Sequence, residues 1–86
     1  MTEVVMYWRP GCPFCVRLER DLVDASVAYM KVNIWEHPEA AQIVRHFAKG
    51  NETVPTVTVG ELAFVNPSID TVLSAVRTME KTERSS

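Results

Sequence analysis

The only two cysteines of the chain lie three residues apart, in the stretch Arg9 to Cys15 (RPGCPFC). An apolar run, residues 4–8, precedes this stretch, and a helical pattern begins at Pro13. Residues i and i+3 lie on one face of a helix, so the two sulfur atoms can come within disulfide distance. A Cys-x-x-Cys motif between a strand and a helix therefore predicts reversible thiol–disulfide chemistry.

The two cysteines are expected to differ in reactivity. Cys12 precedes the helix, where unpaired N–H groups and the helix dipole favour a negative sulfur, and Arg9 adds a positive charge nearby. We predict that Cys12 is the nucleophile and reacts as a thiolate. Cys15 lies one turn inside the helix, on the apolar stripe with Leu18 and Leu22. It is expected to remain a neutral thiol and to resolve the mixed disulfide formed on Cys12.

A metal site and a permanent disulfide are the alternatives for the cysteine pair. His37 and His46 lack the spacing of zinc ligands, and there is no second cysteine pair, so no metal is predicted. The chain starts without the basic and apolar segments of a secretory leader, and no apolar run is long enough to span a bilayer. We therefore expect a cytoplasmic protein, in which a disulfide is usually transient and catalytic.

Size and charge restrict the function classes. The 86 residues suffice for one domain, and 47% apolar and 23% charged residues are ordinary for a folded protein. The net charge of −2 provides no basic surface for phosphate backbones or anionic lipids. Nucleic acid and membrane are therefore not expected as partners.

Hydrophobic patterning predicts an α/β domain with the order β-α-β-α-β-β-α. The expected strands are residues 4–8, 27–34, 56–59 and 62–65. Gly60-Glu61 is predicted to form a type II′ hairpin turn. The helices are expected to start at Pro13, at Pro38 and after residues 66–68. The second helix is predicted to bury Ala40, Ile43, Val44 and Phe47, and the third Ile69, Val72, Leu73, Val76 and Met79.

The domain is expected to comprise residues 1–80. Residues 81–86 have no apolar side chain to pack and are predicted to fray as a C-terminal tail.

Thr53-Val54-Pro55 is the second stretch of interest. Proline is normally confined to the first residue of a strand or to an edge, and most X-Pro bonds are trans. If the bond before Pro55 is instead cis, the backbone of Val54 would offer hydrogen bonds to an extended, peptide-like thiol. The residues alone leave both states open.

Together, the RPGCPFC stretch and Thr53-Val54-Pro55 resemble the glutaredoxin branch of the thioredoxin superfamily. Glutathione-using glutaredoxins usually have a Gly-Gly pair after the last strand, where this chain has Asn66-Pro67; Asp70 remains at the matching acidic position. Residues 50–57 together with 66–68 are more similar to the mycoredoxins, glutaredoxin-like bacterial proteins that use the thiol mycothiol.

The resemblance implies a monomeric thiol–disulfide oxidoreductase with a three-layer thioredoxin-like fold and a mixed four-stranded sheet. It implies that Cys12 is the nucleophile, that Cys15 is its partner and that Pro55 is cis. The remaining residues expected at the thiol-binding groove are Arg9 at its mouth, Phe14 as an apolar lip, Thr53, Val54, and Asn66, Ser68 and Asp70 at the far end.

Two of these assignments have a simpler alternative. Arg9 can be a solvated turn residue, and Asp70 can merely complement the dipole of the last helix. Trp8 is expected in the core, as aromatic residues at strand ends usually are.

The implied reaction is attack by Cys12 on a protein–mycothiol mixed disulfide, which releases the protein thiol. A second mycothiol frees Cys12, and a flavoprotein mycothiol disulfide reductase recycles the product. No bound cofactor is expected; mycothiol, rather than glutathione, would be the co-substrate, and S-thiolated or disulfide-containing proteins the substrates. Three alternatives stay open: an electron donor reduced directly by thioredoxin reductase, a redox-sensing adaptor, and a dimer that binds an iron–sulfur cluster.

Overall fold

The computed structural model describes residues 3–85, and the side chains of residues 3–81. Its elements follow the predicted order β-α-β-α-β-β-α. In chain order they are β1 (Val4–Trp8), α1 (Pro13–Asp24), β2 (Met30–Asn33), α2 (Pro38–Phe47), β3 (Thr56–Val59), β4 (Leu62–Val65) and α3 (Ile69–Ser85).

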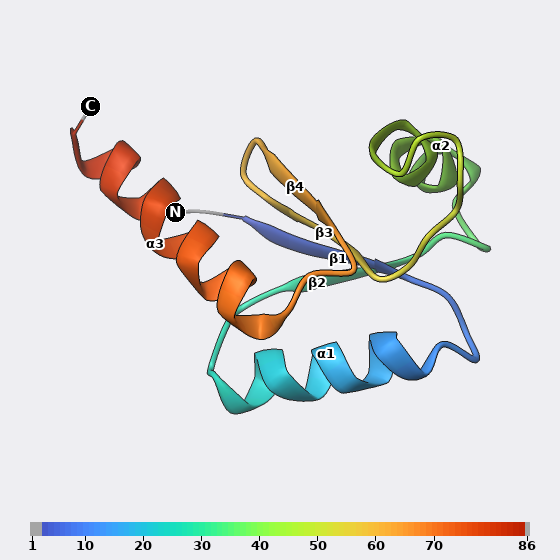
Figure 1. Ribbon diagram of the computed structural model, residues 1–86, viewed down its shortest axis with the longest axis horizontal. Coiled ribbons are helices and arrows are strands. Elements are labelled where there is room, and N and C mark those ends of the chain that lie inside the picture. Colours follow the sequence, from blue (N-terminus) through green and yellow to red (C-terminus); the bar gives the residue numbers. More distant parts are fainter. Residues whose placement is uncertain (1–2, 86) are drawn as a thin grey trace.

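The four strands form one mixed sheet with the order β2-β1-β3-β4. β1 pairs parallel with β2 and antiparallel with β3, and β3 pairs antiparallel with β4. Helices α1 and α3 cover one face of this sheet and α2 covers the other (Figure 1). The predicted three-layer fold with a mixed four-stranded sheet is therefore confirmed.

Each face of the sheet has its own hydrophobic core, because side chains alternate along a strand. Val4 and Met6 of β1 pack with Leu18 and Leu22 of α1. Tyr7 points to the opposite face and packs with Ala40, Ala41 and Val44 of α2; this second core extends to the two cysteines at the start of α1. This double burial explains why residues 4–8 are an almost unbroken apolar run.

Strand β2 is shorter than the predicted range 27–34. Its register pairs Met30 with Val5, so most of the segment before Met30 extends past the start of β1 and has no strand to pair with. That segment instead completes the end of α1: the amide of Val27 donates to the carbonyl of Leu22 at 3.0 Å, and Ser26 adopts a φ of 58°. Apolar composition alone did not reveal this boundary.

Helix α2 buries a narrower stripe than predicted. Ala40 and Val44 are buried as expected, and so is Ala41, whereas Ile43 and Phe47 are exposed. The two small alanines allow α2 to lie close to the sheet, which leaves the larger side chains at the sides of the helix.

Helix α3 begins as predicted after Ser68, whose Oγ accepts a hydrogen bond from the amide of Thr71 at 3.2 Å. Val72 and Ala75 are buried, and the other predicted stripe residues are half-buried. α3 continues to Ser85, so it includes most of the segment that was predicted to fray. This segment has no proline or glycine, and its lysine, glutamate and arginine are good helix formers.

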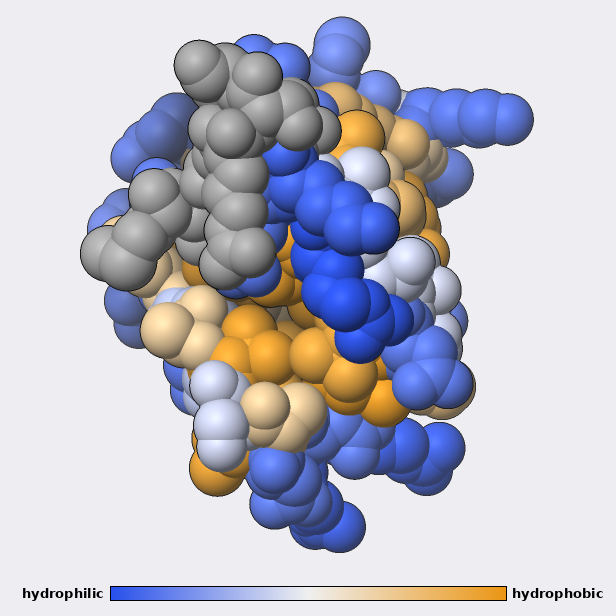
Figure 2. Space-filling view, turned by 90° about the vertical axis from the view of Figure 1, so that its left-hand side faces the viewer, coloured by the Kyte–Doolittle hydropathy of each residue, from blue (hydrophilic) through white to orange (hydrophobic). Residues whose placement is uncertain are grey.

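The β3–β4 hairpin turns at Gly60, where φ is 57° and Val59 pairs with Leu62. A positive φ at the first loop position, and not at the second, is what a type II′ turn requires. The turn lies against α3: a Cβ at Gly60 would be 2.7 Å from Cε of Met79. Figure 2 shows this end of the molecule, at which α1 and α3 finish. An area of apolar side chains is visible there, bordered by hydrophilic ones. This end lies away from the N-terminus of α1.

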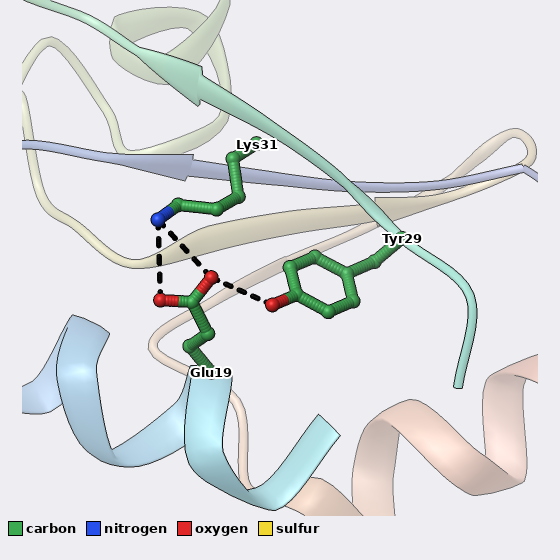
Figure 3. Close-up of polar contacts among 3 residues, drawn as sticks. All are labelled: Glu19, Tyr29 and Lys31. Atoms are coloured by element: carbon green, nitrogen blue, oxygen red, sulfur yellow. Dashed lines mark hydrogen bonds and ion pairs between the residues drawn. The ribbon is translucent and has the colours of Figure 1, made fainter. Parts of the chain in front are cut away.

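A polar cluster connects β2 to α1 (Figure 3). Glu19 of α1 accepts a hydrogen bond from the hydroxyl of Tyr29 at 2.6 Å and lies 3.1 Å from Nζ of Lys31. These contacts lower the pKa of Glu19, and the hydrogen bond to Glu19 raises the pKa of Tyr29 to about 12. Lys31 also lies 4.5 Å from the ring centroid of Trp8. The cluster fixes the edge strand β2 against α1.

Among the helices described for residues 3–85, none has the length and apolar character needed to cross a membrane.

Candidate active site

Cys12 occupies the N-cap of α1. Its φ of −106° and ψ of 103° are extended, and its Sγ accepts a hydrogen bond from the amide of Cys15 at 3.2 Å. Pro13 follows at the first helical position, where the missing N–H has no cost. The sulfur in the cap position therefore lies at the N-terminal end of α1, against the backbone of its first turn.

Cys15 lies on the buried face of α1, with only 3% of its surface exposed, against 5% for Cys12. Both cysteines are free thiols. Burial, followed by the hydrogen bond with Cys12, raises the pKa of Cys15 from 9.0 to about 12. The thiol of Cys15 is therefore neutral at neutral pH, as its position on the apolar stripe led us to expect.

The loop before β3 approaches Cys12 from the other side. The Val54–Pro55 peptide bond is cis, as the resemblance implied. The Sγ of Cys12 lies 3.8 Å from the carbonyl oxygen of Val54, to which the thiol can donate. Thr53 anchors the loop, because its carbonyl accepts a hydrogen bond from Oγ1 of Thr56 at 2.8 Å.

The far end of the predicted groove begins at Asn66. Its amide donates to the carbonyl of Pro55 at 2.7 Å, which ties the start of α3 to the cis-proline loop. Asn66 has a φ of 50°, a left-handed conformation that glycine adopts freely and asparagine tolerates. Asn66 thus supplies one conformation that a Gly-Gly pair would provide. Ser68 caps α3, and Asp70 is exposed in its first turn.

Arg9 lines the cavity that also contacts the cysteines, and its side chain lies against the exposed Trp35. The guanidinium carbon of Arg9 lies 5.8 Å from the ring centroid of Trp35, and its Nη1 donates weakly to the carbonyl of Pro10 at 3.4 Å. Trp35 is 62% exposed and Phe14 56% exposed. Phe14 can therefore serve as the predicted apolar lip.

Sequence reasoning did not single out Trp35. The available signal was a tryptophan directly after a predicted strand and two residues after an asparagine, a residue that favours turns. In the structure, Oδ1 of Asn33 accepts a hydrogen bond from the Trp35 amide at 2.9 Å, and the chain turns there.

A cavity of about 190 Å³ lies behind the cysteines, between α1 and the sheet. Trp8, Glu19 and Lys31 line it together with both cysteines. Trp8 is half-buried and packs against both cores, so it is a core residue as predicted, yet it also borders the site. Within the described side chains, no group of three or more His, Cys, Asp or Glu could hold a metal ion.

The structure brings Cys12, Cys15 and Val54 into contact, with Arg9 beside them. The family model of the glutaredoxins matches residues 4–63. The chain belongs to the glutaredoxin family. A provisionally named glutaredoxin of Mycobacterium tuberculosis strain H37Rv is 36% identical to it over 70 residues, which make up 80% of this chain and 83% of that protein.

Solved structures of similar proteins share the fold of this chain. The glutaredoxin-like NrdH-redoxin of Escherichia coli has a TM-score of 0.72 and 25% identity; the match covers 84% of this chain and 92% of that one. A glutaredoxin of Archaeoglobus fulgidus has a TM-score of 0.73 and 24% identity, covering 90% of this chain and 88% of that one. This glutaredoxin is a thiol–disulfide oxidoreductase with a Cys-Pro-Phe-Cys motif.

Proposed function

We propose that this glutaredoxin reduces mixed disulfides between proteins and mycothiol, with Cys12 as the nucleophile. The Cys12 thiolate attacks the mycothiol sulfur, and the protein leaves as a thiolate that takes up a proton. The thiolate of a second mycothiol attacks the sulfur of the first, which gives mycothiol disulfide and restores the Cys12 thiolate. A flavoprotein disulfide reductase then returns mycothiol disulfide to two thiols with electrons from NADPH.

The observation that carries this proposal is the position of the Cys12 sulfur. It lies at the N-cap of α1, 3.2 Å from the amide of Cys15 and 3.8 Å from the carbonyl of Val54. No hydrogen bond among the described residues uses the amide of Val54. This amide can therefore bind the backbone-like part of a thiol held beside Cys12.

The buried state of Cys15 favours the route in which Cys12 works alone. A thiol with a pKa of about 12 is almost never ionised at neutral pH, and only the thiolate attacks a disulfide. We therefore expect a second molecule of mycothiol, and not Cys15, to resolve the mixed disulfide.

The choice of mycothiol over glutathione rests on Asn66-Pro67. Proline has no N–H, so Pro67 cannot donate a backbone hydrogen bond to a carboxylate as a glycine could. Glutathione presents carboxylates to its binding site, whereas the sugar end of mycothiol presents hydroxyl groups. We expect the reaction to take place in the cytoplasm, where thiols are kept reduced.

The proposal is tested by coupled NADPH consumption with one protein substrate prepared in two forms, S-mycothiolated and S-glutathionylated. We expect turnover of the first form with mycothiol and mycothiol disulfide reductase, and at least about tenfold less of the second form with glutathione and glutathione reductase, a difference of about 1.4 kcal/mol in transition-state binding. Equal or faster turnover with glutathione would overturn the choice of thiol. Cys12→Ser, as the control, should remove turnover in every arm.

The relative in Escherichia coli supports a second candidate function. NrdH-redoxin is described as glutaredoxin-like with a thioredoxin-like activity profile. By analogy, this chain could accept electrons directly from thioredoxin reductase, which would require the Cys12–Cys15 disulfide as intermediate. Turnover with thioredoxin reductase and no added low-molecular-weight thiol, lost in Cys15→Ser, would establish this second function.

A further inference from the structure

Trp35 is the most exposed large hydrophobic side chain among the described residues. The turn that carries it is held by hydrogen bonds on both sides. The Trp35 amide donates to Oδ1 of Asn33 at 2.9 Å, and the amide of the buried Ile34 donates to the carbonyl of Trp8 at 2.9 Å. The exposed ring is therefore built into the end of β2. Tryptophan and arginine are enriched among the residues that contribute most to protein interfaces, so this ring is a candidate contact for a partner.

Arg9 connects Trp35 to the reactive cysteines. The guanidinium carbon of Arg9 lies 5.8 Å from the centroid of the Trp35 ring, and Arg9 lines the same cavity as both cysteines. The sheet explains this placement: β1 and β2 are parallel and Trp8 pairs with Asn33, so the residues that follow them leave the sheet at the same edge. Because 62% of Trp35 stays exposed beneath Arg9, the stacked pair still offers an open apolar surface.

Arg9 carries a charge that this chain leaves without a counterion. Among the described side chains, no Asp or Glu forms an ion pair with Arg9, and its hydrogen bond to the carbonyl of Pro10 is long, at 3.4 Å. A guanidinium can bind a carboxylate through two parallel hydrogen bonds. Val16, which lines the same cavity, is also exposed. Beside Cys12 the surface therefore combines one free cation with apolar side chains.

We propose that Arg9, Val16 and Trp35 form a contact surface for the protein substrate, and that this surface favours a substrate cysteine with an acidic residue beside it. The acidic side chain pairs with Arg9, and apolar atoms of the same segment cover the ring of Trp35. The net charge of −2 on the whole chain disfavours acidic segments at long range, so such a preference can come only from the local cation. The proposal concerns the protein half of the disulfide and does not depend on which small thiol the protein uses.

The first test uses three peptides that differ only in the residues on both sides of their single cysteine, which are Glu, Gln or Lys. Each cysteine is in a mixed disulfide with thionitrobenzoate, a thiol that absorbs light when released. The Cys12 thiolate attacks the peptide sulfur, forms a disulfide with it and displaces the coloured thiolate, so absorbance gives the second-order rate constant. Each value is divided by that for mercaptoethanol with the same peptide, which removes the intrinsic effect of the flanking charges.

We expect the corrected rate constant to be about tenfold higher for the Glu peptide than for the Lys peptide at low salt, because attraction is replaced by repulsion at Arg9. The difference should shrink at high salt.

Four variants locate this preference. Arg9→Gln should bring the ratio of the Glu to the Lys rate constant to about one. Trp35→Ala should lower the ratio about threefold, since the guanidinium loses the ring that holds it, whereas Trp35→Phe keeps an aromatic face and should retain most of the ratio. Val23→Ala, at an exposed apolar position in the last turn of α1, is the matched control and should leave the ratio unchanged.

The second test leaves the contact surface intact. Cys15→Ser holds a mixed disulfide on Cys12, which can be prepared with the Glu peptide or with mercaptoethanol. Trp8 and Trp35 are the only tryptophans of the chain, so their two indole N–H resonances can be followed separately. We expect the Trp35 resonance to differ between the two adducts, and to differ more than that of Trp8.

Three results would contradict the proposal: equal rate constants for the Glu and Lys peptides, a preference for Glu that persists in Arg9→Gln, or a Trp35 resonance that is the same in both adducts. None of these experiments contains mycothiol. Their failure therefore leaves the proposed choice of thiol untouched, and a failure of mycothiol to support turnover would leave this contact surface standing.

Discussion

The pKa of Cys15 predicts how its reaction with a mixed disulfide on Cys12 depends on pH. Burial and the contact with Cys12 raise this pKa from 9.0 to about 12. At pH 7 the thiolate fraction is then roughly 1 in 100,000, compared with about 1 in 100 for a pKa of 9, so the intramolecular step starts with about a thousandfold fewer thiolates. When Cys12 is in a mixed disulfide, burial, the largest cause of the raised pKa of Cys15, remains.

The expected result is a rate that rises about tenfold per pH unit from pH 6 to 9, because the thiolate fraction of a group with a high pKa grows in that proportion. The assay is rapid mixing of the reduced protein with a small disulfide whose released thiol absorbs light, without any other thiol present. The fast release reports Cys12, and the slow second release reports Cys15. Cys15→Ser, the control, should lose only the slow release.

A slow phase that levels off between pH 7 and 8 would refute this reasoning. It would show that Cys15 ionises readily once Cys12 is bound, and that the buried environment does not hold its proton. In that case the route through the Cys12–Cys15 disulfide would compete with free thiol at neutral pH.

Three further predictions concern the nucleophile and stability. Cys12→Ser should abolish reduction of mixed disulfides, since a serine alkoxide is inaccessible at neutral pH; retained activity would mean that Cys15 can act as nucleophile. Tyr29→Phe removes the hydrogen bond to Glu19 and should cost about 1 kcal/mol in urea unfolding at pH 7. Because the pKa of Glu19 is lowered in the folded state, this contribution is present above pH 4.5 and is lost as pH falls further, so an equal cost at pH 7 and pH 3 would contradict it. Gly60→Ala should destabilise by about 1–2 kcal/mol in the same assay, because φ is 57° and the new Cβ would contact Met79; unchanged stability would show that the turn adapts.

Local signals in the sequence were sufficient for most of the fold. Proline at the start of helices, the glycine turn and the apolar periodicities predicted the order of the elements, the bounds of β1, β3 and β4, and the start of α1. The predicted strand 27–34 starts too early, because the start of β2 depends on its register with β1. Met30 pairs with Val5, and most of the residues before Met30 run past the start of β1. A strand boundary of this kind is a property of the partner strand and is absent from the segment's own composition.

The site shows the same division between local and tertiary information. The spacing of Cys12 and Cys15 is enough to predict that their side chains lie together, and the apolar stripe of α1 predicts that Cys15 is buried. The residues of the other elements are not predictable in this way: Glu19, Tyr29 and Lys31 are individually ordinary surface residues, and only the packing of β2 against α1 brings them together. Their place beside the cavity behind the cysteines could be found only in three dimensions.

The contrast between the two cysteines follows from one helix boundary. Because Cys12 is the N-cap, its side chain turns back toward the first free amides of α1 and meets the loop carrying Val54. Cys15 is three residues further on and already helical, so its side chain follows the stripe of Leu18 into the interior and loses solvent. Pro13, which suits only the first turn of a helix, therefore fixes the boundary that places Cys12 at the cap and Cys15 inside α1.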